Sequence, residues 1–305
     1  MTERTPILDL VTQLILILGL LLALAPLWLV FVAATLDLRS VNSSPLPILP
    51  GPHLFENLQA VWVRSDLGPK MANSLLVATL VAGGKVFLAA LTAFSIVFFR
   101  WKLRMVVFWG IFVTLMLPLE VRIVPTYAVA ANALGPLQTI LDVTGVTWLW
   151  QSVTGIRLAL EWNLLNSYTG LILPLVATAT GTFLYRQYFL TIPDELLEAA
   201  RMDGAGPLRF FKDVLIPLSR TNMAALSTIM FLYAWNQYLW PTLVTTDRAN
   251  YGTATMELRQ LIPSLFSEPE WHIAMAGTLI VMTPPLLVVM LMQRWFVAGL
   301  IAPEK

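Results

Sequence analysis

The sequence predicts an all-α membrane protein that crosses the bilayer several times. Of its 305 residues, 57% are hydrophobic and only 12% are charged, whereas soluble domains carry about a quarter charged residues. The apolar runs are long and continuous, which favours helices over the short alternating strands of a barrel. Cysteine is absent, so disulfides, thiol nucleophiles and thiolate metal sites are excluded.

Six segments are apolar enough and long enough to cross a bilayer, which takes about 20 residues of helix. In chain order they are residues 10–36, 71–99, 105–134, 164–190, 221–246 and 273–297. The first is far longer than the apolar core of a secretion signal, so we expect an uncleaved anchor. The second contains Lys85, and the third contains Glu120 and Arg122.

The Lys and Arg residues between these segments predict the orientation, because positive charge concentrates on the cytoplasmic side. With the N-terminus inside, the inner segments hold eleven of these residues and the outer segments hold six. The densest cluster, Arg186–Arg220, lies between the fourth and fifth helices. We therefore expect this cluster and both termini in the cytoplasm.

Residues 137–163 are apolar enough to suggest a seventh crossing. One more crossing would move the Arg186–Arg220 cluster outside, and Asp142 and Gln151 would suit lipid poorly. The sequence therefore favours an extracytoplasmic position for residues 137–163, as an interfacial helix or a re-entrant turn.

The cytoplasmic loop 191–219 predicts two short helices joined by a sharp turn. Thr191 is a suitable cap for the first helix, whose first turn contains Pro193, and Gly204 is suited to end it in a left-handed conformation. The dipeptide Gly206-Pro207 restarts the chain as a second helix up to Pro217. Such a segment would either dock into a groove on another protein or lie on the lipid headgroups.

The spacing in this loop resembles a known signature. The letters EAARMDG, followed by nine residues and then VLIP, are similar to the EAA signature of permease subunits of ATP-binding-cassette (ABC) importers. Val214 and Ile216 depart conservatively from that pattern. The resemblance implies a coupling helix that fits a cleft of a cytoplasmic ATPase, and it assigns that role to Glu198, Ala199, Ala200, Asp203, Gly204 and Pro217.

Other segments resemble the carbohydrate-uptake, or maltose-type, branch, and within it most of all the sn-glycerol-3-phosphate permeases. They include LMLPLEVRIVPTY (115–127), LNSYTGLILPL (165–175) and YAWNQYLWPTLVTTD (233–247). The resemblance covers nearly the whole chain except residues 137–163, which look like an insertion. It implies the type I importer permease fold, with six transmembrane helices, in a bacterial inner membrane.

The same resemblance implies the partners and the cargo. The partners would be a second permease, a homodimeric ATPase and an extracytoplasmic solute-binding protein, and the cargo would be sn-glycerol 3-phosphate or another sugar, polyol or oligosaccharide. No phosphate-loop motif is present, so ATP would be bound by a partner subunit and this chain would hold no cofactor. The outer loop Asp247–His272, with its SEPEW letters, would either reach the binding protein or serve as a solvated connector.

Charged residues at membrane depth are the first candidates for the substrate path, because hydrocarbon makes them costly. Arg122 could bind a phosphate with two donors, whereas Arg122 or Lys85 could instead neutralise a carboxylate, such as Glu120, from an adjacent helix. Glu120 and Arg122 are two residues apart and do not face each other. In the maltose relative the partner permease holds the sugar. Four residues of the fifth segment would line a polyol pathway, join helices or lie at the membrane interface, namely Asn236, Gln237, Tyr238 and Trp240.

Other classes of function fit the sequence less well. A membrane enzyme would need a nucleophile with a base, or metal ligands, whereas His53 and His272 are far apart and outside the apolar runs. An ion-coupled secondary transporter would need ion sites and usually repeated halves. The net charge of +1, with no long basic block, gives no support for a nucleic-acid partner, so the bilayer and the importer subunits are the expected partners.

Overall fold

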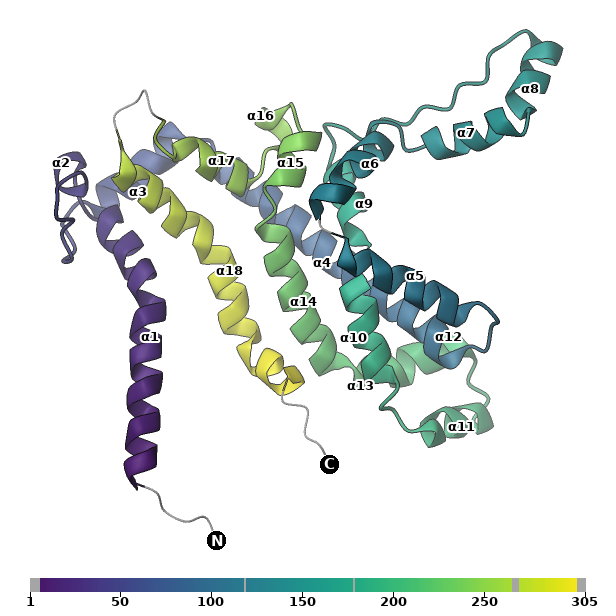
Figure 1. The fold of residues 1–305 in the computed structure, drawn as a ribbon, viewed down its shortest axis with the longest axis horizontal. Helices are drawn as coiled ribbons and strands as arrows, with labels where there is room; N and C mark the ends of the chain where they lie inside the picture. The colour runs from purple at the N-terminus through teal and green to yellow at the C-terminus, as the bar shows by residue number, and fades with distance from the viewer. Residues whose placement is uncertain (1–5, 118, 178, 265–268, 301–305) are drawn as a thin grey trace. The chain divides into compact units, whose positions relative to one another are not determined.

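The structure is a computed structural model in which residues 6–117, 119–177, 179–264 and 269–300 are described. Every regular element in these ranges is a helix, which agrees with the predicted all-α class (Figure 1). The chain forms two units, each of which is described by itself. The first contains Met1–Met71 and Met256–Thr283, and the second contains Ala72–Thr255 and Pro284–Lys305.

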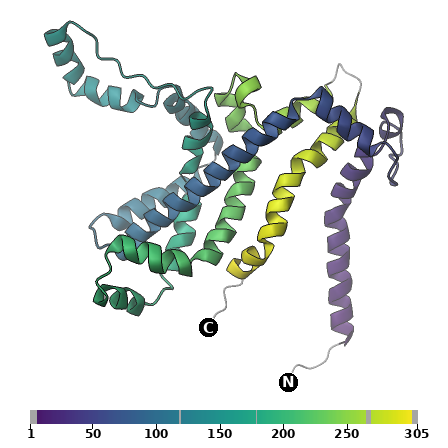
Figure 2. The ribbon, with the colours of Figure 1, turned by 180° about the vertical axis from the view of Figure 1, so that it is seen from behind.

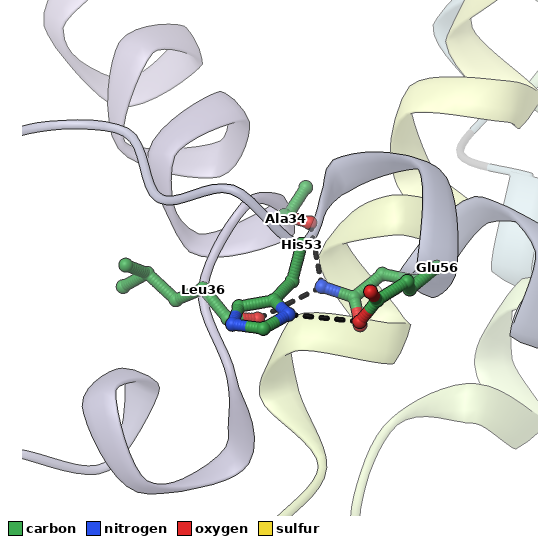
Figure 3. Close-up of polar contacts among 5 residues, drawn as sticks. Ala34, Leu36, His53 and Glu56 are labelled. Carbon is green, nitrogen blue, oxygen red and sulfur yellow. Dashed lines mark hydrogen bonds and ion pairs between the residues drawn. The ribbon is translucent and has the colours of Figure 1, made fainter.

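The first unit is built around the end of one long apolar helix. Its elements are α1 (Pro6–Ala34), α2 (Leu38–Val41), α3 (Leu54–Arg64), the start of α4 (Leu67–Phe98), most of α17 (Ala254–Leu261) and the first part of α18 (Trp271–Leu300). The Asn57 amide of α3 donates to the carbonyls of Ala34 and Leu36, at 2.9 and 2.8 Å, beside the His53–Glu56 contact (Figure 3). These bonds satisfy carbonyl groups at and just beyond the α1 terminus.

The second unit contains most of α4 and the helices that follow it (Figure 2). They are α5 (Arg104–Met116), α6 (Leu119–Ala131), α7 (Gly135–Val143), α8 (Val146–Thr154), α9 (Tyr168–Val176), α10 (Ala179–Phe189), α11 (Asp194–Met202), α12 (Pro207–Phe210), the π-helical turn Phe211–Leu215, α13 (Ile216–Leu218), α14 (Arg220–Trp235), α15 (Leu239–Val244) and α16 (Arg248–Tyr251). The last part of α18 belongs to the same unit.

Three single helices in the described residues are long and apolar enough to cross a membrane, namely Ile7–Ala34, Leu67–Phe98 and Trp271–Trp295. The number rises to five if each of two bent pairs makes one crossing: α9 with α10, bent by 43°, and the Pro207–Leu218 segment with α14, bent by 78°. The expectation of one continuous helix over 105–134, 164–190 and 221–246 is wrong, because each segment is broken. A total of six crossings stays a prediction.

Pro174 lies inside α9, two residues before that helix ends within segment 164–190. Proline has no N–H to donate, so the Gly170 carbonyl one turn earlier loses its helical partner. The buried Trp240 indole N–H donates to that carbonyl at 3.1 Å. A side chain from α15 thus replaces the hydrogen bond that the proline removes.

Pro241 has the same effect on the fifth predicted segment. Its ring prevents the usual bond to the Gln237 carbonyl, and the chain unwinds between α14 and α15. The Thr255 hydroxyl donates to that carbonyl at 2.7 Å.

In the third segment, the break follows Leu117, whose extended backbone (φ −82°, ψ 119°) is typical of a residue before proline.

Residues 137–163 form two short helices rather than a crossing. α7 and α8 have 9 residues each, which corresponds to about 14 Å of helix and is too short for a bilayer. Large apolar side chains, including Val143, Trp148 and Val153, are exposed on them. Within the second unit, α7 and α8 lie at the opposite end from α11 and α12 (Figures 1 and 2).

Candidate functional site: an exposed short helix and a cationic cavity

The candidate coupling helix, α11, begins at Asp194 after Pro193, the residue that flanks the helix as its N-cap. The predicted cap, Thr191, is wrong, because its hydroxyl donates to the Tyr188 carbonyl at 2.7 Å and not to an α11 N–H. Asp194 and Glu195 occupy the first turn, where carboxylates complement the helix dipole. Charge in the first turn therefore stabilises the start of this helix.

Gly204 ends α11 in the left-handed conformation that the sequence predicts, with φ of +71°. The Gly204 N–H donates to the Arg201 carbonyl at 3.0 Å, and the Ala205 N–H donates to the Ala200 carbonyl at 2.9 Å. These two bonds form a complete Schellman motif, which satisfies the last carbonyls of the helix. Nothing lies within 4 Å of a Cβ built on Gly204, so conformation and not space requires glycine there.

α11 exposes nearly all of its surface. Ala200 is its one buried residue, whereas Glu198, Ala199, Asp203 and Gly204 are exposed. Three carboxylates, those of Asp194, Glu195 and Glu198, lie on this short helix. Such a surface is accessible to a partner with a complementary basic groove.

The second half of the loop restarts as predicted, with Gly206 before Pro207 at the start of α12. The helical path continues through the π-helical turn and α13 to Leu218, one residue beyond the predicted end at Pro217. The exposed Arg209–Asp213 pair, 3.5 Å apart, lies on this segment.

An aromatic cluster that the sequence analysis missed joins this loop to the long helices. Phe211 and Phe210 lie 5.0 and 5.4 Å, between ring centroids, from Phe94 and Phe98 of α4. Phe98 also contacts Phe189 of α10 at 5.9 Å. The spacing of Phe94 and Phe98, one turn apart, was the available signal, but the partners are distant in sequence. A displacement of the loop would therefore act directly on α4 and α10.

A cavity of about 720 Å³ lies farther along α4, within the second unit. Its lining comes from α4, α5, α6, α9, α10, α14 and α15, with two charged side chains, Lys85 and Arg122. Tyr233 and Trp240 line it as well; Trp240 was among the path candidates of the sequence, whereas Tyr233 was not. No carboxylate is among the described lining residues.

The two cations meet different environments. Lys85 is only 6% exposed, and its ammonium lies 4.2 Å from the centre of the Tyr233 ring, a cation–π contact. Arg122 is half-buried, and its Nε is buried without a hydrogen-bond partner in the described structure. Glu120 belongs to α6, but its side chain lies outside the described part, so the expected pairing with Glu120 stays a prediction.

The other predicted path residues do not line this cavity. Asn236, Gln237 and Tyr238 form the unwound segment between α14 and α15, where Asn236 and Tyr238 are exposed. In the first unit, Glu270 of the SEPEW letters pairs with Arg64 at 3.0 Å, and the Pro269 carbonyl accepts from Asn42 at 3.1 Å. Ser267 and Glu268 of the same letters lie outside the described residues.

The chain matches a protein family over most of its length and several known permeases over all of it. The family described as binding-protein-dependent transport system inner membrane component matches residues 85–301. The chain is 46% identical, over 311 aligned residues and 100% of both chains, to the sn-glycerol-3-phosphate transport system permease protein UgpE of Yersinia pestis (bv. Antiqua). The proteins of that name from Pectobacterium atrosepticum and Salmonella typhi are each 45% identical with the same coverage.

A solved structure has a similar fold. It is a chain of the crystal structure of a bacterial ABC transporter involved in the import of the acidic polysaccharide alginate, with a TM-score of 0.74. The match covers 97% of this chain and 99% of that chain, at 19% sequence identity. At that identity the match is informative about the fold alone.

Proposed function

Because the chain belongs to the family of binding-protein-dependent transport system inner membrane components, we propose that it is the permease subunit of an ATP-driven importer of sn-glycerol 3-phosphate. The family predicted from the EAA signature is thereby confirmed. One observation carries the proposed cargo: 46% identity over the full length of a permease named for that substrate. Another sugar, polyol or oligosaccharide is the second candidate cargo.

The role is that of a membrane subunit and not of an enzyme. A permease of an ABC importer works with a partner permease, an ATPase and a solute-binding protein. We infer further that two identical ATPase subunits bind the ATP, and that this chain and its partner permease share one translocation path. The outer loop Asp247–His272 is our candidate contact for the binding protein.

We propose that α11 is the coupling helix. The exposed Glu198, the turn fixed at Gly204, and the aromatic cluster behind α12 together support this assignment. Nucleotide-driven closure of the ATPase would move α11, and the cluster would pass the movement to α4 and α10. α4 also lines the cavity, and Phe94 is nine residues from Lys85, about 14 Å along the helix.

We expect the inner-membrane permease to place residues Arg186–Arg220 and both ends of the sequence in the cytoplasm, following the eleven-to-six distribution of positive charge. The native chain has no cysteine, so single cysteines report the topology. An impermeant thiol reagent added to intact cells should label Gln151→Cys in α8 and not Arg209→Cys in α12. Labelling of Arg209→Cys from outside would contradict this orientation.

The cargo is tested by uptake into vesicles that contain the whole importer, isolated with its partner permease and ATPase and supplied with the binding protein. We expect ATP-dependent uptake of sn-glycerol 3-phosphate, and little uptake of maltose or free glycerol. Preferred uptake of maltose would refute sn-glycerol 3-phosphate as the cargo. Transport by the chain alone, driven by an ion gradient, would indicate a secondary transporter.

A further inference from the structure

Lys85 and Arg122 bring two positive charges into one cavity. They come from different helices, α4 and α6, and both side chains line the same space. No described carboxylate lies within ion-pair distance of either. Charge in a segment at membrane depth is costly, so a cationic pair with no counter-charge among the described side chains favours a ligand of opposite charge.

The geometry of Lys85 leaves its donors available. The Tyr233 ring stabilises the charge through its face, while the ammonium has no hydrogen-bond acceptor among the described residues. An ammonium carries three N–H donors, and a ring face engages its charge without supplying an oxygen acceptor. Lys85 is therefore held in place as a cation that can still donate.

Arg122 adds a second set of donors at the start of a broken helix. It lies in the first turn of α6, and its Nε is buried without a partner. Ala179 and Thr180, in the first turn of α10, line the same cavity. N-termini of discontinuous helices carry partial positive charge, so two helix starts and two cationic side chains favour an anion in this space.

The cavity also offers acceptors for hydroxyl groups. The hydroxyls of Thr92, Thr114 and Thr126 line it and donate to carbonyls of their own helices, at 2.8, 2.6 and 2.7 Å. Their oxygens keep lone pairs for an incoming O–H. A volume of about 720 Å³ is within the usual range for small-molecule sites.

We propose that Lys85 and Arg122 bind the phosphate group of the cargo during translocation, with the threonine oxygens facing its hydroxyl groups. This inference rests on the proposed function and deepens it, because it assigns the anion contact to this permease and not solely to its partner. The preferred ligand is a small phosphate monoester of a polyol, whose two negative charges match the two cations.

The test compares uptake rate per assembled importer for Lys85→Met, Arg122→Ala and Arg122→Lys. The control is Lys102→Met, which removes an exposed lysine outside the cavity. We expect Lys85→Met and Arg122→Ala to lower uptake of sn-glycerol 3-phosphate by about tenfold or more, because each removes a charged hydrogen-bonding group. Arg122→Lys should be intermediate, since it keeps the charge and loses the planar fork.

A second readout separates contact with the cargo from structural damage. Binding-protein-stimulated ATP hydrolysis and the yield of assembled importer should stay at the wild-type level in the variants that lose uptake. Wild-type uptake in assembled Lys85→Met and Arg122→Ala importers would overturn the inference. Failure of all three variants to assemble would also overturn it. So would an Arg122→Ala importer that assembles only when Glu120→Gln is added. Either result assigns the cations a structural role.

The proposed function fails in a different way. A wild-type importer that assembles but does not take up sn-glycerol 3-phosphate would refute the cargo before any variant is compared.

Discussion

Replacement of Gly204 with valine should abolish transport while the permease still inserts in the membrane and joins its partner permease. Gly204 has φ of +71°, and its conformation lets the Gly204 and Ala205 N–H groups close the end of α11. A left-handed backbone costs a residue with a side chain about 1–2 kcal/mol, and a β-branched residue more. With valine, α11 would lose its defined end, and the exposed helix could no longer present one shape to the ATPase.

The control is Gly206→Ala, only two positions along the chain. Gly206 has φ of −72°, and nothing lies within 4 Å of its added Cβ, so alanine should be tolerated there. Glu198→Lys should fail as Gly204→Val does, since it reverses an exposed charge without altering the turn. The measurement is uptake beside the amount of ATPase that co-purifies with the permease. Wild-type uptake by Gly204→Val and Glu198→Lys would refute the coupling assignment.

The coupling segment was predictable because its conformation depends on nearby residues. A left-handed glycine, an initial proline and first-turn carboxylates act within one or two turns, and the structure has them as the sequence indicates. The start of α11 was harder to predict, because a threonine hydroxyl can accept from an N–H of the helix that follows or donate to a carbonyl of the helix that precedes. Its hydroxyl bonds backward, to Tyr188, and Pro193 flanks the helix.

The helix breaks were harder to predict, because apolar composition alone continues through them. Pro174 and Pro241 indicate that two carbonyls lose their helical bonds, but not which distant group replaces the donor. Trp240 lies 70 residues from Gly170, and Thr255 lies 18 residues from Gln237. The replacement partner depends on tertiary packing, which a local pattern does not contain.

The cavity was predictable in its charges and in one aromatic residue, Trp240. Lys85 and Arg122 are conspicuous in apolar segments, and the structure brings them to one space. Tyr233 has no such signal, because an aromatic residue in an apolar helix is ordinary core or lipid-facing material. Polarity also made Asn236, Gln237 and Tyr238 conspicuous. These residues form the unwound segment between α14 and α15 and do not line the cavity.

Gly170 is packed directly against the backbone of Leu164 in the second unit. An added Cβ would overlap the Leu164 carbonyl oxygen and lie 2.9 Å from the carbonyl carbon. Ser167 fixes this turn, since its hydroxyl donates to Leu164 at 2.6 Å and accepts from the Gly170 N–H at 3.0 Å. Asn166 in the same turn accepts from the Thr246 N–H at 2.7 Å, which connects the turn to the end of α15.

We therefore expect Gly170→Ala to destabilise this unit. Excess volume in a packed site costs about 1–3 kcal/mol, and the upper end applies because the neighbour is backbone and cannot rotate away. The turn would have to move from α9, which would also strain the Trp240 bond to Gly170.

The measurement is the thermal unfolding temperature and yield of the purified importer, beside Gly110→Ala in α5. Nothing lies within 4 Å of a Cβ on Gly110, and alanine favours a helix, so that control should match or exceed the wild type. Equal stability of the two variants would contradict a close contact at Gly170, and with it the argument that this turn holds α9 and α15 together.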